Sequence, residues 1–552
     1  MAAREDLGQL RPRVEQRLAT LARERFVDRL WAKDPGLWPG DPAAIGRRLG
    51  WLEAPERAGE TWAAVQPLRE LVRERQIDHC VLLGMGGSSL FPEVLSEVFG
   101  PGPGGVPLTV LDTTDPAAIA AVESTLDLEH TLFVVASKSG TTIETMSLYR
   151  YFSAKGGLYL AITDPGTPLS QTCEAAGFVT CLHAPPEVGG RYSALTHFGL
   201  APAALLGLDA APLLEAARTL ATQCRRPPAE NPGLRLGAFL GEAALAGRDK
   251  LTLVTSEAIA PFADWIEQLV AESTGKQGRG IVPIVGEALT GMEGYGDDRI
   301  FVEIAMHGEA DRLEPLREKG QPCLRIELDS KAALGAEVMR WEIATAVAGA
   351  ILEVNPFDEP DVALSKRLTQ EILEARKSGP AEAPTAVEVA DGLAFFADPD
   401  LPASADVLQA HLDRVTPGDY LAILAYLPAN ESTRRDLEAL RNWLRAQTGV
   451  ATTLGYGPRF QHSTGQLHKG GPPTGVFLQL TWDASPELPI PGADYDFATL
   501  EAAQALGDFR ALVERGRRVL RIHLGDHYGE GLERLLKRAT DGVSPRAPRE
   551  RG

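Results

Sequence analysis

Short apolar runs that alternate with helix-like stretches are the feature that most constrains how this chain can fold. Each run is four to six residues long, which suits a buried strand, and each is separated from the next by turn residues and amphipathic spacing. Strands that alternate with helices predict an α/β fold with doubly wound parallel sheets. The runs are His79–Leu83, Leu108–Leu111, Leu132–Ala136, Leu158–Ile162, Leu251–Thr255, Ile281–Val285, Ile300–Ile304, Cys323–Leu328, Tyr420–Leu424, Val450–Leu454, Val476–Leu480 and Val519–Ile522.

Breaks in composition divide these runs into groups of four. The first break is Arg225–Pro232, and the second is the Pro-, Glu- and Ala-rich segment Ser378–Thr385. The Pro- and Arg-rich tail from Asp541 is expected to be frayed. We therefore predict an N-terminal helical region at 1–75, two doubly wound domains at 76–232 and 233–380, and a C-terminal α/β domain at 381–552.

The charge balance argues against several kinds of partner. The 552 residues carry 55 Lys and Arg against 75 Asp and Glu, a formal net charge of −20, and an acidic chain binds nucleic acid and anionic lipid poorly. No apolar run approaches the roughly 18 residues of a membrane span, and the N-terminal segment lacks a secretory apolar core. The five cysteines show no CxxC spacing, so we expect no disulfides, no metal site and a cytoplasmic location.

The turn Gly84-Met85-Gly86-Gly87-Ser88-Ser89 follows the first run and opens a helix. Its glycines permit close backbone approach, and free amides at a helix start favour an anion. A dinucleotide site with Asp112 as the ribose-binding acid is one alternative, although the third glycine of that pattern is missing near Ser89. A tight turn without a ligand is another. This segment alone does not choose between an anion site, a dinucleotide site and a turn without a ligand.

A second turn, Ser137-Lys138-Ser139-Gly140-Thr141-Thr142, gathers four hydroxyls, one cation and a glycine between a strand and a helix. This inventory suits a phosphate monoester, because hydroxyls and amides donate hydrogen bonds while the helix dipole favours a dianion. A helix cap needs only one hydroxyl, and the spacing of a Walker loop is absent. We interpret the segment as a phosphate-binding loop.

Several segments together resemble the glucose-6-phosphate isomerase family, which is built from two sugar-isomerase (SIS) domains. A further segment, His462–Gly471, resembles the isomerase half of bifunctional transaldolase/glucose-6-phosphate isomerase proteins. The resemblance implies reversible conversion of glucose 6-phosphate and fructose 6-phosphate through a cis-enediol, with no metal or other cofactor. The matching segments, in family order, are Gly84–Ser88, Ser137–Thr142, Val188–Ser193, Ala271–Lys276 and Asn355–Asp358.

The resemblance also implies roles for individual residues. Glu272 matches the base that moves a proton between C2 and C1, and Arg191 matches the arginine that stabilises the enediolate. Lys366 matches a lysine that assists ring opening, and His462 matches the histidine that passes the ring-oxygen proton. The positions that match sugar-phosphate-binding residues are Gly87, Ser88, Ser137, Lys138, Ser139, Thr142 and Gln268.

The histidine motif departs from the family order, because His462 follows Lys366 instead of lying between Glu272 and Lys366. His468 and Lys469 are close enough in sequence to be the participants instead. In family dimers the histidine comes from the neighbouring subunit. The resemblance therefore leaves two arrangements open, a homodimer or a monomer whose C-terminal domain completes the site.

Two other functions also remain open at this point. One is isomerisation of another phosphosugar, such as mannose 6-phosphate, and the other is non-catalytic binding of sugar phosphates by an SIS-type protein. The second function would require the phosphate loop but not Glu272, Arg191 and Lys366 together, so we expect an enzyme.

Overall fold

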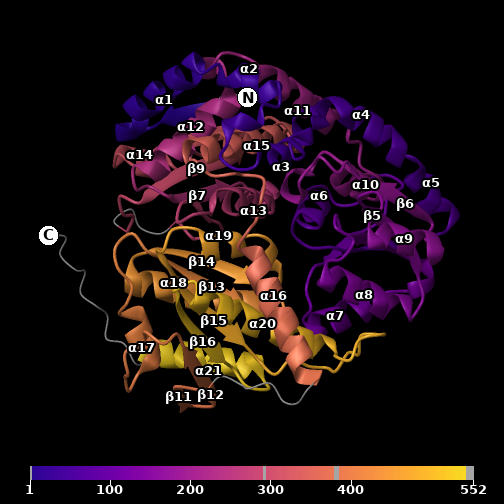
Figure 1. Cartoon of the computed structure of the whole chain (residues 1–552), viewed down its shortest axis with the longest axis vertical. Coiled ribbons are helices and arrows are strands. Elements are labelled where there is room, and N and C mark those ends of the chain that lie inside the picture. The colour runs from indigo at the N-terminus through magenta and orange to yellow at the C-terminus, as the bar shows by residue number, and fades with distance from the viewer. Residues whose placement is uncertain (1–2, 290–293, 378–384, 542–552) are drawn as a thin grey trace.

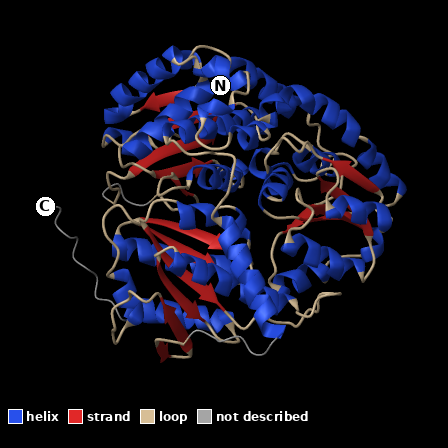
Figure 2. Cartoon of the chain, viewed as in Figure 1, coloured by secondary structure: helices blue, strands red, loops and turns tan. Residues whose placement is uncertain are grey.

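Three β-sheets with helices packed against them make up the computed structural model, which describes residues 3–289, 294–377 and 385–541 (Figures 1 and 2). Each predicted apolar run contains a strand, and the α/β prediction is confirmed. Most of the predicted break at Ser378–Thr385 and of the tail from Asp541 lies outside the described residues.

The helices lie mainly between successive strands of each sheet. They are α1 (Arg11–Arg23), α2 (Phe26–Trp31), α3 (Pro42–Gly46), α4 (Ala54–Val65), α5 (Pro67–Glu74), α6 (Leu90–Phe99), α7 (Pro116–Glu123), α8 (Ile143–Ser153), α9 (Pro168–Ala175), α10 (His197–Leu205), α11 (Ala211–Gln223), α12 (Pro232–Leu245), α13 (Phe262–Thr274), α14 (Glu314–Glu318), α15 (Leu334–Ile351), α16 (Val362–Lys377), α17 (Val407–Leu412), α18 (Glu431–Thr448), α19 (Gly465–Gly470), α20 (Phe497–Glu514) and α21 (Tyr528–Asp541).

The first sheet is parallel throughout, and its strand order places two of the predicted turns side by side. Its strands, in spatial order, are β3 (Leu108–Leu111), β2 (His79–Leu83), β4 (Thr131–Ala136), β5 (Leu158–Thr163) and β6 (Thr180–His183). The chain leaves β2 for β3 on one side and then returns to β4 on the other. The carboxyl ends of β2 and β4 therefore form a switch point, where open α/β sheets bind ligands.

The second sheet includes a strand from the very start of the described chain. Its strands, in spatial order, are β1 (Ala3–Asp6), β10 (Cys323–Leu328), β9 (Arg299–Met306), β7 (Lys250–Thr255) and β8 (Val282–Ile284). Because β1 pairs antiparallel with β10, the prediction of helices alone over residues 1–75 is wrong at its start. The backbone of β1 pairs with the open edge of β10. The charged side chains of β1 do not show the apolar pattern that predicts a strand.

The third sheet is parallel at its centre and antiparallel at one edge. Its strands, in spatial order, are β11 (Glu388–Ala390), β12 (Leu393–Ala397), β16 (Arg518–His523), β15 (Gly475–Thr481), β13 (Tyr420–Ala425) and β14 (Ala451–Tyr456). Only β11 and β12 run antiparallel to their neighbours. Here the chain goes from β13 to β14 on one side and to β15 on the other, so the switch point lies between β13 and β15.

Helices of the C-terminal part pack directly on the rest of the chain. Leu373 of α16 and Phe497 and Leu500 of α20 share a core with Phe133 of the first sheet. On the other side, α19 packs against α13, as Figure 1 also shows. The segment between β14 and β15, which carries the histidine motif, therefore lies where the three sheets meet.

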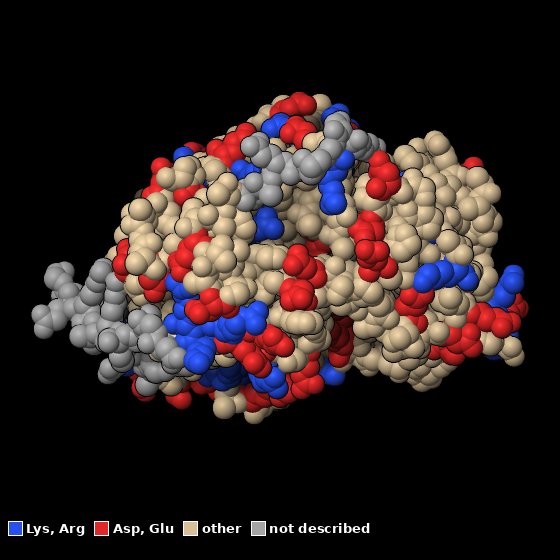
Figure 3. Space-filling model, turned by 90° about the horizontal axis from the view of Figure 1, so that it is seen from below, with Lys and Arg blue, Asp and Glu red and all other residues tan. Residues whose placement is uncertain are grey.

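Charged side chains of both signs lie on the face shown in Figure 3, where Lys and Arg side chains are interspersed with Asp and Glu side chains. None of the helices in the described ranges combines the length and the apolar character that a membrane crossing requires.

Candidate active site

The Gly84–Ser89 turn is packed tightly against three other segments. Gly86 has a φ of +55°, and a Cβ there would lie 2.7 Å from both Gln268 Nε2 and the carbonyl oxygen of His462. A Cβ on Gly87 would lie 2.2 Å from the carbonyl of Gly190. Only glycine leaves room for these contacts, so the turn joins the segments that carry His462, Gln268 and Arg191.

Asp112, the residue that a dinucleotide site would require, is already engaged within the protein. Its carboxylate accepts a hydrogen bond from Ser89 Oγ at 3.0 Å and lies 3.4 Å from Arg459 Nη1. The carboxylate thus has protein partners beside the turn. This arrangement gives Asp112 a packing role and favours the anion interpretation of the turn over the dinucleotide one.

The Ser137–Thr142 loop leaves the start of α8 without a side-chain cap. Thr142 is the N-cap residue, yet its hydroxyl bonds Ser137 Oγ at 2.9 Å and not a helix amide. Ser137 Oγ also accepts from the amide of Gly140 at 3.1 Å. The capping interpretation of these hydroxyls therefore fails, while the amides at the helix start are available to an anion.

Two other predicted binding residues in this loop have different surroundings. Lys138 Nζ contacts both carboxylate oxygens of Asp164 at 2.7 Å and the carbonyl of Pro185 at 3.1 Å. Its charge is thus balanced within the protein. Ser139 is exposed and accepts a hydrogen bond from Thr141 Oγ1 at 3.0 Å, whereas Ser88, in the neighbouring turn, is 7% exposed.

Glu272, Arg191 and Gln268 form one buried cluster beside these loops. The Oε1 atom of Glu272 lies 3.2 Å from Arg191 Nη1, and its Oε2 atom accepts from Gln268 Nε2 at 3.2 Å. Gln268 and Glu272 lie one turn apart on α13, so both face the same side of that helix. The structure brings together the three side chains that the sequence analysis assigned to one site.

Arg191 is held rigidly by its remaining contacts. Its Nε donates to Ser273 Oγ at 2.8 Å, its Nη2 donates to the carbonyls of Pro356 and Asp358 at 2.7 and 2.9 Å, and its Nη1 donates to Glu359 Oε2 at 3.1 Å. A guanidinium fixed on every nitrogen keeps its charge at one place. The Asn355–Asp358 segment therefore acts as a support for Arg191.

The electrostatics of this cluster suit a base. Burial raises the pKa of Glu272 above its ordinary value, although the charge of Arg191 opposes that effect. Burial alone would lower the pKa of Arg191, but Glu272 and Glu359 outweigh it and the pKa lies above its ordinary value. A carboxylate whose pKa is raised towards the working pH is a stronger general base than an exposed one.

His462 lies in this cluster within the same chain. Its backbone carbonyl accepts from Gln268 Nε2 at 2.7 Å, and its Nε2 lies 3.0 Å from Glu144 Oε1 in the first turn of α8. Burial would raise the pKa of Glu144, but His462 overcomes this and the pKa lies below its ordinary value. Glu144 thus orients the imidazole, a role that nothing in the sequence indicated.

His468 and Lys469 lie away from this cluster and are buried among other residues. His468 Nδ1 is 3.1 Å from Tyr420 Oη, and Lys469 pairs with Asp508 at 2.6 Å. Burial lowers the pKa of His468 well below its ordinary value, with further lowering from Lys469 and Arg517. A histidine that stays neutral is a poor proton carrier, and both residues support α19 by packing.

Lys366 is exposed on α16, and its charge helps to lower the pKa of Glu144. This interaction places Lys366 on the His462 side of the cluster. Among the described residues, no group of three or more His, Cys, Asp and Glu side chains could hold a metal ion.

Comparison with known proteins identifies the family of this chain. A family model described as phosphoglucose isomerase matches residues 72–297. The chain is 32% identical over 395 residues to glucose-6-phosphate isomerase of Rubrobacter xylanophilus, covering 59% of this chain and 90% of that protein. It is 30% identical over 397 residues to glucose-6-phosphate isomerase of Thermus thermophilus, covering 60% of this chain and 91% of that protein.

A solved structure supports the same relationship. The crystal structure of a hypothetical protein from Thermus thermophilus superposes with a TM-score of 0.58 at 28% identity, covering 67% of this chain and 100% of that chain. Fold and site together define an isomerase with two SIS-type α/β domains. The chain belongs to the phosphoglucose isomerase family, with a large part of its length beyond these relatives.

Proposed function

We propose that this chain is a glucose-6-phosphate isomerase that interconverts glucose 6-phosphate and fructose 6-phosphate through a cis-enediol. The observation that carries the proposal is the ion pair of Glu272 and Arg191 at 3.2 Å, which lies beside an uncapped helix start rich in hydroxyls. The names of the relatives support the same substrate pair.

In the proposed reaction the sugar phosphate binds first. The phosphate accepts hydrogen bonds from Ser88, Ser137, Ser139 and Thr142 and from amides at the start of α8, where the helix dipole favours a dianion. Lys138, already paired with Asp164, holds the loop in shape and adds positive charge nearby. Gln268 contacts the sugar hydroxyls through an oxygen, Oε1, that has no partner among the described residues.

Ring opening and proton transfer then follow. His462, oriented by Glu144, passes the proton between the ring oxygen and O1, with Lys366 nearby to assist. The Glu272 carboxylate removes the proton from C2, and the C–H electrons form the C1–C2 double bond of the enediolate. The O2 proton passes to O1, and the same carboxyl group returns its proton to C1 as the C2 carbonyl forms. Arg191 stabilises the negative oxygen of the intermediate, an effect worth on the order of 10²–10³ in rate.

The substitution Glu272→Gln tests the proposal. It removes the base but keeps the hydrogen bond to Gln268, so kcat should fall by roughly 10²–10⁴-fold with little change in thermal stability. Fructose 6-phosphate conversion is measured by linking glucose 6-phosphate formation to NADP reduction by a second enzyme. Glu267→Gln on the same helix is the matched control and should retain activity.

Each alternative function predicts a different result in this assay. A wild-type protein that converts mannose 6-phosphate but not glucose 6-phosphate would reassign the substrate. A wild-type protein that binds fructose 6-phosphate without turnover would reveal a non-catalytic binding protein. Full activity in Glu272→Gln would show that another group is the base.

A further inference from the structure

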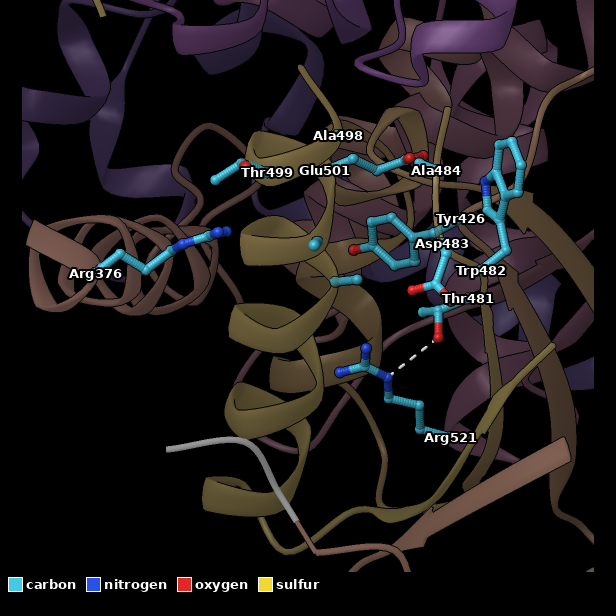
Figure 4. Close-up of a pocket in the computed structure, with 12 residues that line it drawn as sticks. Arg376, Tyr426, Thr481, Trp482, Asp483, Ala484, Ala498, Thr499, Glu501 and Arg521 are labelled. Carbon is cyan, nitrogen blue, oxygen red and sulfur yellow. Dashed lines mark hydrogen bonds between the residues drawn. The ribbon is translucent and has the colours of Figure 1, made fainter. Parts of the chain in front are cut away.

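A second cavity lies in the C-terminal part of the molecule, lined by none of the residues assigned to the isomerase reaction. Its volume is about 230 Å³. It lies between α20 and the third sheet, near the carboxyl ends of β13 and β15 (Figure 4). These strands flank the switch point of the sheet, the position at which open α/β sheets bind ligands.

Arg521 supplies a cation to this cavity that has no counter-charge. Its Nε donates to Thr481 Oγ1 at 3.3 Å, and no carboxylate among the described residues lies within ion-pair distance of its guanidinium. Burial lowers the pKa of Arg521 to about 10, so the group remains charged at neutral pH. Its guanidinium also lies 5.6 Å from the centroid of the Phe396 ring. A partly buried cation without a carboxylate partner is costly, and a bound anion would reduce that cost.

Glu501 is a second polar residue in the cavity, and one of its carboxyl oxygens, Oε1, lacks a hydrogen-bond partner among the described residues. The residue is 3% exposed. Burial and the nearby charge of Asp115 raise the pKa of Glu501 well above its ordinary value. A raised pKa favours the protonated form of the carboxyl group, which can donate a hydrogen bond to a ligand oxygen.

Small, hydroxyl-bearing and aromatic residues line the rest of the cavity together with Asp483, whose carboxylate lies 3.4 Å from His523 Nε2. Ala498, Ala502 and Ala505 of α20 leave open space opposite the sheet, and Thr499 contributes a hydroxyl. Arg376 extends from α16 towards α20, as Figure 4 shows, and adds a second guanidinium at the exposed side.

We propose that this cavity is a second ligand site, which binds a small metabolite carrying a phosphate or carboxylate group together with hydroxyl groups. The oxyanion pairs with Arg521 and Arg376, because guanidinium groups donate paired hydrogen bonds to such oxygens. The hydroxyl groups of the ligand contact Thr481 and Glu501. The volume, below the roughly 300 Å³ at which drug-sized pockets begin, limits the ligand to a few carbon atoms.

The cavity is close to the isomerase site but does not share its residues. Tyr426, at its wall, accepts a hydrogen bond from Gln461, the residue before His462. Gln504, three residues beyond Glu501 on α20, donates to Glu144 at 2.7 Å. Substitutions at Ala502 and Arg521 leave both hydrogen bonds intact, so isomerase activity serves as a control for correct folding in the test below.

Equilibrium dialysis against radiolabelled inorganic phosphate tests the proposal. The wild-type chain should bind phosphate at two places, the Ser137–Thr142 loop and the cavity. Ala502→Leu fills the cavity and Arg521→Gln removes the cation, so each should weaken one of the two binding events about tenfold or more while isomerase activity is kept. The double substitution Ser137→Ala and Thr142→Val should weaken only the other event.

The outcomes separate this proposal from the proposed isomerase function. A single phosphate per wild-type chain that is lost only on substitution of Ser137 and Thr142 overturns the second site and leaves the isomerase proposal intact. Unchanged binding in both Ala502→Leu and Arg521→Gln also overturns it. Competition by malonate, which carries no phosphorus, identifies a carboxylate ligand if it displaces phosphate only from the cavity, and a phosphate ester if it does not.

Discussion

At the scale of single residues, the site combines one carboxylate, the proposed base Glu272, and one cation, Arg191, which influence each other's charge. Arg191 stabilises the ionised form of Glu272, while burial favours the protonated form. The two effects oppose each other, so the pKa of Glu272 depends on both. Any change at Arg191 should therefore alter the pH dependence of the reaction as well as its rate.

We expect Arg191→Gln to shift the acid limb of the pH–rate profile upwards. The base must be ionised to act, so kcat/KM falls as the pH drops through the pKa of Glu272, which burial raises above its ordinary value. Without the cation that pKa rises further, and kcat also falls by roughly 10²–10³-fold. The measurement is kcat/KM against pH.

The control for this experiment is Arg57→Gln, which removes an exposed arginine paired with Glu187. Its profile should match that of the wild type. An acid limb that stays in place or moves to lower pH in Arg191→Gln would contradict the electrostatic link between Arg191 and Glu272.

The two histidines of the C-terminal motif should respond differently to substitution. We expect His462→Asn to lower kcat about 10²-fold with little loss of thermal stability, because the side chain lies at the site beside Glu144. His468→Asn should instead lower the melting temperature, because the buried ring packs against Tyr420 and Phe477. Thermal melts and kcat are measured on both variants, and the reverse pattern would favour His468 as the proton carrier.

At the scale of elements, the site depends on how closely its turns approach one another. The turn after β2 contacts the Gly189–Ser193 segment, α13 and the His462 segment, all through the backbone of two glycines. The three contacts fix the position of the Gly84–Ser89 turn relative to Arg191, Gln268 and His462.

Gly87→Ala tests this dependence. The added methyl group would lie 2.2 Å from the Gly190 carbonyl, so the two turns must separate, at a cost of about 1–3 kcal/mol in the free energy of unfolding. Displacement of Arg191 should lower kcat by up to about 10²-fold. Gly46→Ala, where a Cβ meets nothing within 4 Å, is the control in denaturant unfolding and activity assays, and equal behaviour of the two variants would contradict the packing argument.

At the scale of the whole molecule, the third sheet carries His462 to the cluster within one chain. Gln268 and the His462 carbonyl are hydrogen-bonded at 2.7 Å, and Gln466 of α19 donates to Asp361 Oδ2 at 2.7 Å. Both contacts fix the C-terminal part to the sheets that carry the base. We therefore favour a site completed by one chain over one shared between subunits.

Mixing two inactive variants distinguishes these arrangements. When Glu272→Gln and His462→Asn chains are unfolded together and refolded, a site shared between subunits would regain about a quarter of the activity in mixed dimers, following the two-fold symmetry of such interfaces. A site completed within one chain should regain none. Sedimentation of the wild type at assay concentration identifies the active species, and recovery of activity would contradict our arrangement.

Much of the fold follows from local sequence patterns. Apolar runs such as Leu132–Ala136 identify strands buried on both faces, because only helices on both sides of a sheet accommodate them. Strands that lack an apolar run are not predicted from the local sequence. The charged strand Ala3–Asp6 and the short edge strands β6 and β11 form because a neighbouring strand offers backbone partners, which the local sequence does not reveal.

The site likewise has features that local sequence predicts and features that depend on contacts between distant segments. The hydroxyl-rich loop and the Gly84–Ser89 turn are recognisable because each lies within a few residues of chain, whereas the pair Gln268 and Glu272 is recognised through the resemblance to the family. The bond between His462 and Glu144, 318 residues apart, and the clamp of Glu359 on Arg191 are not. Nor does sequence reveal the cavity around Arg521, whose walls come from separate strands and helices.

The sequence by itself determined a hydroxyl-rich loop that suits a phosphate, because such a loop depends on residue identity and short spacing, whereas the roles expected for Glu272 and Arg191 came from the resemblance to a family. Only the tertiary structure decided which histidine of the motif lies beside Glu144 and Gln268. Long-range packing of α16, α19 and α20 made that decision, since contacts between distant segments depend on how whole sheets and helices fit together.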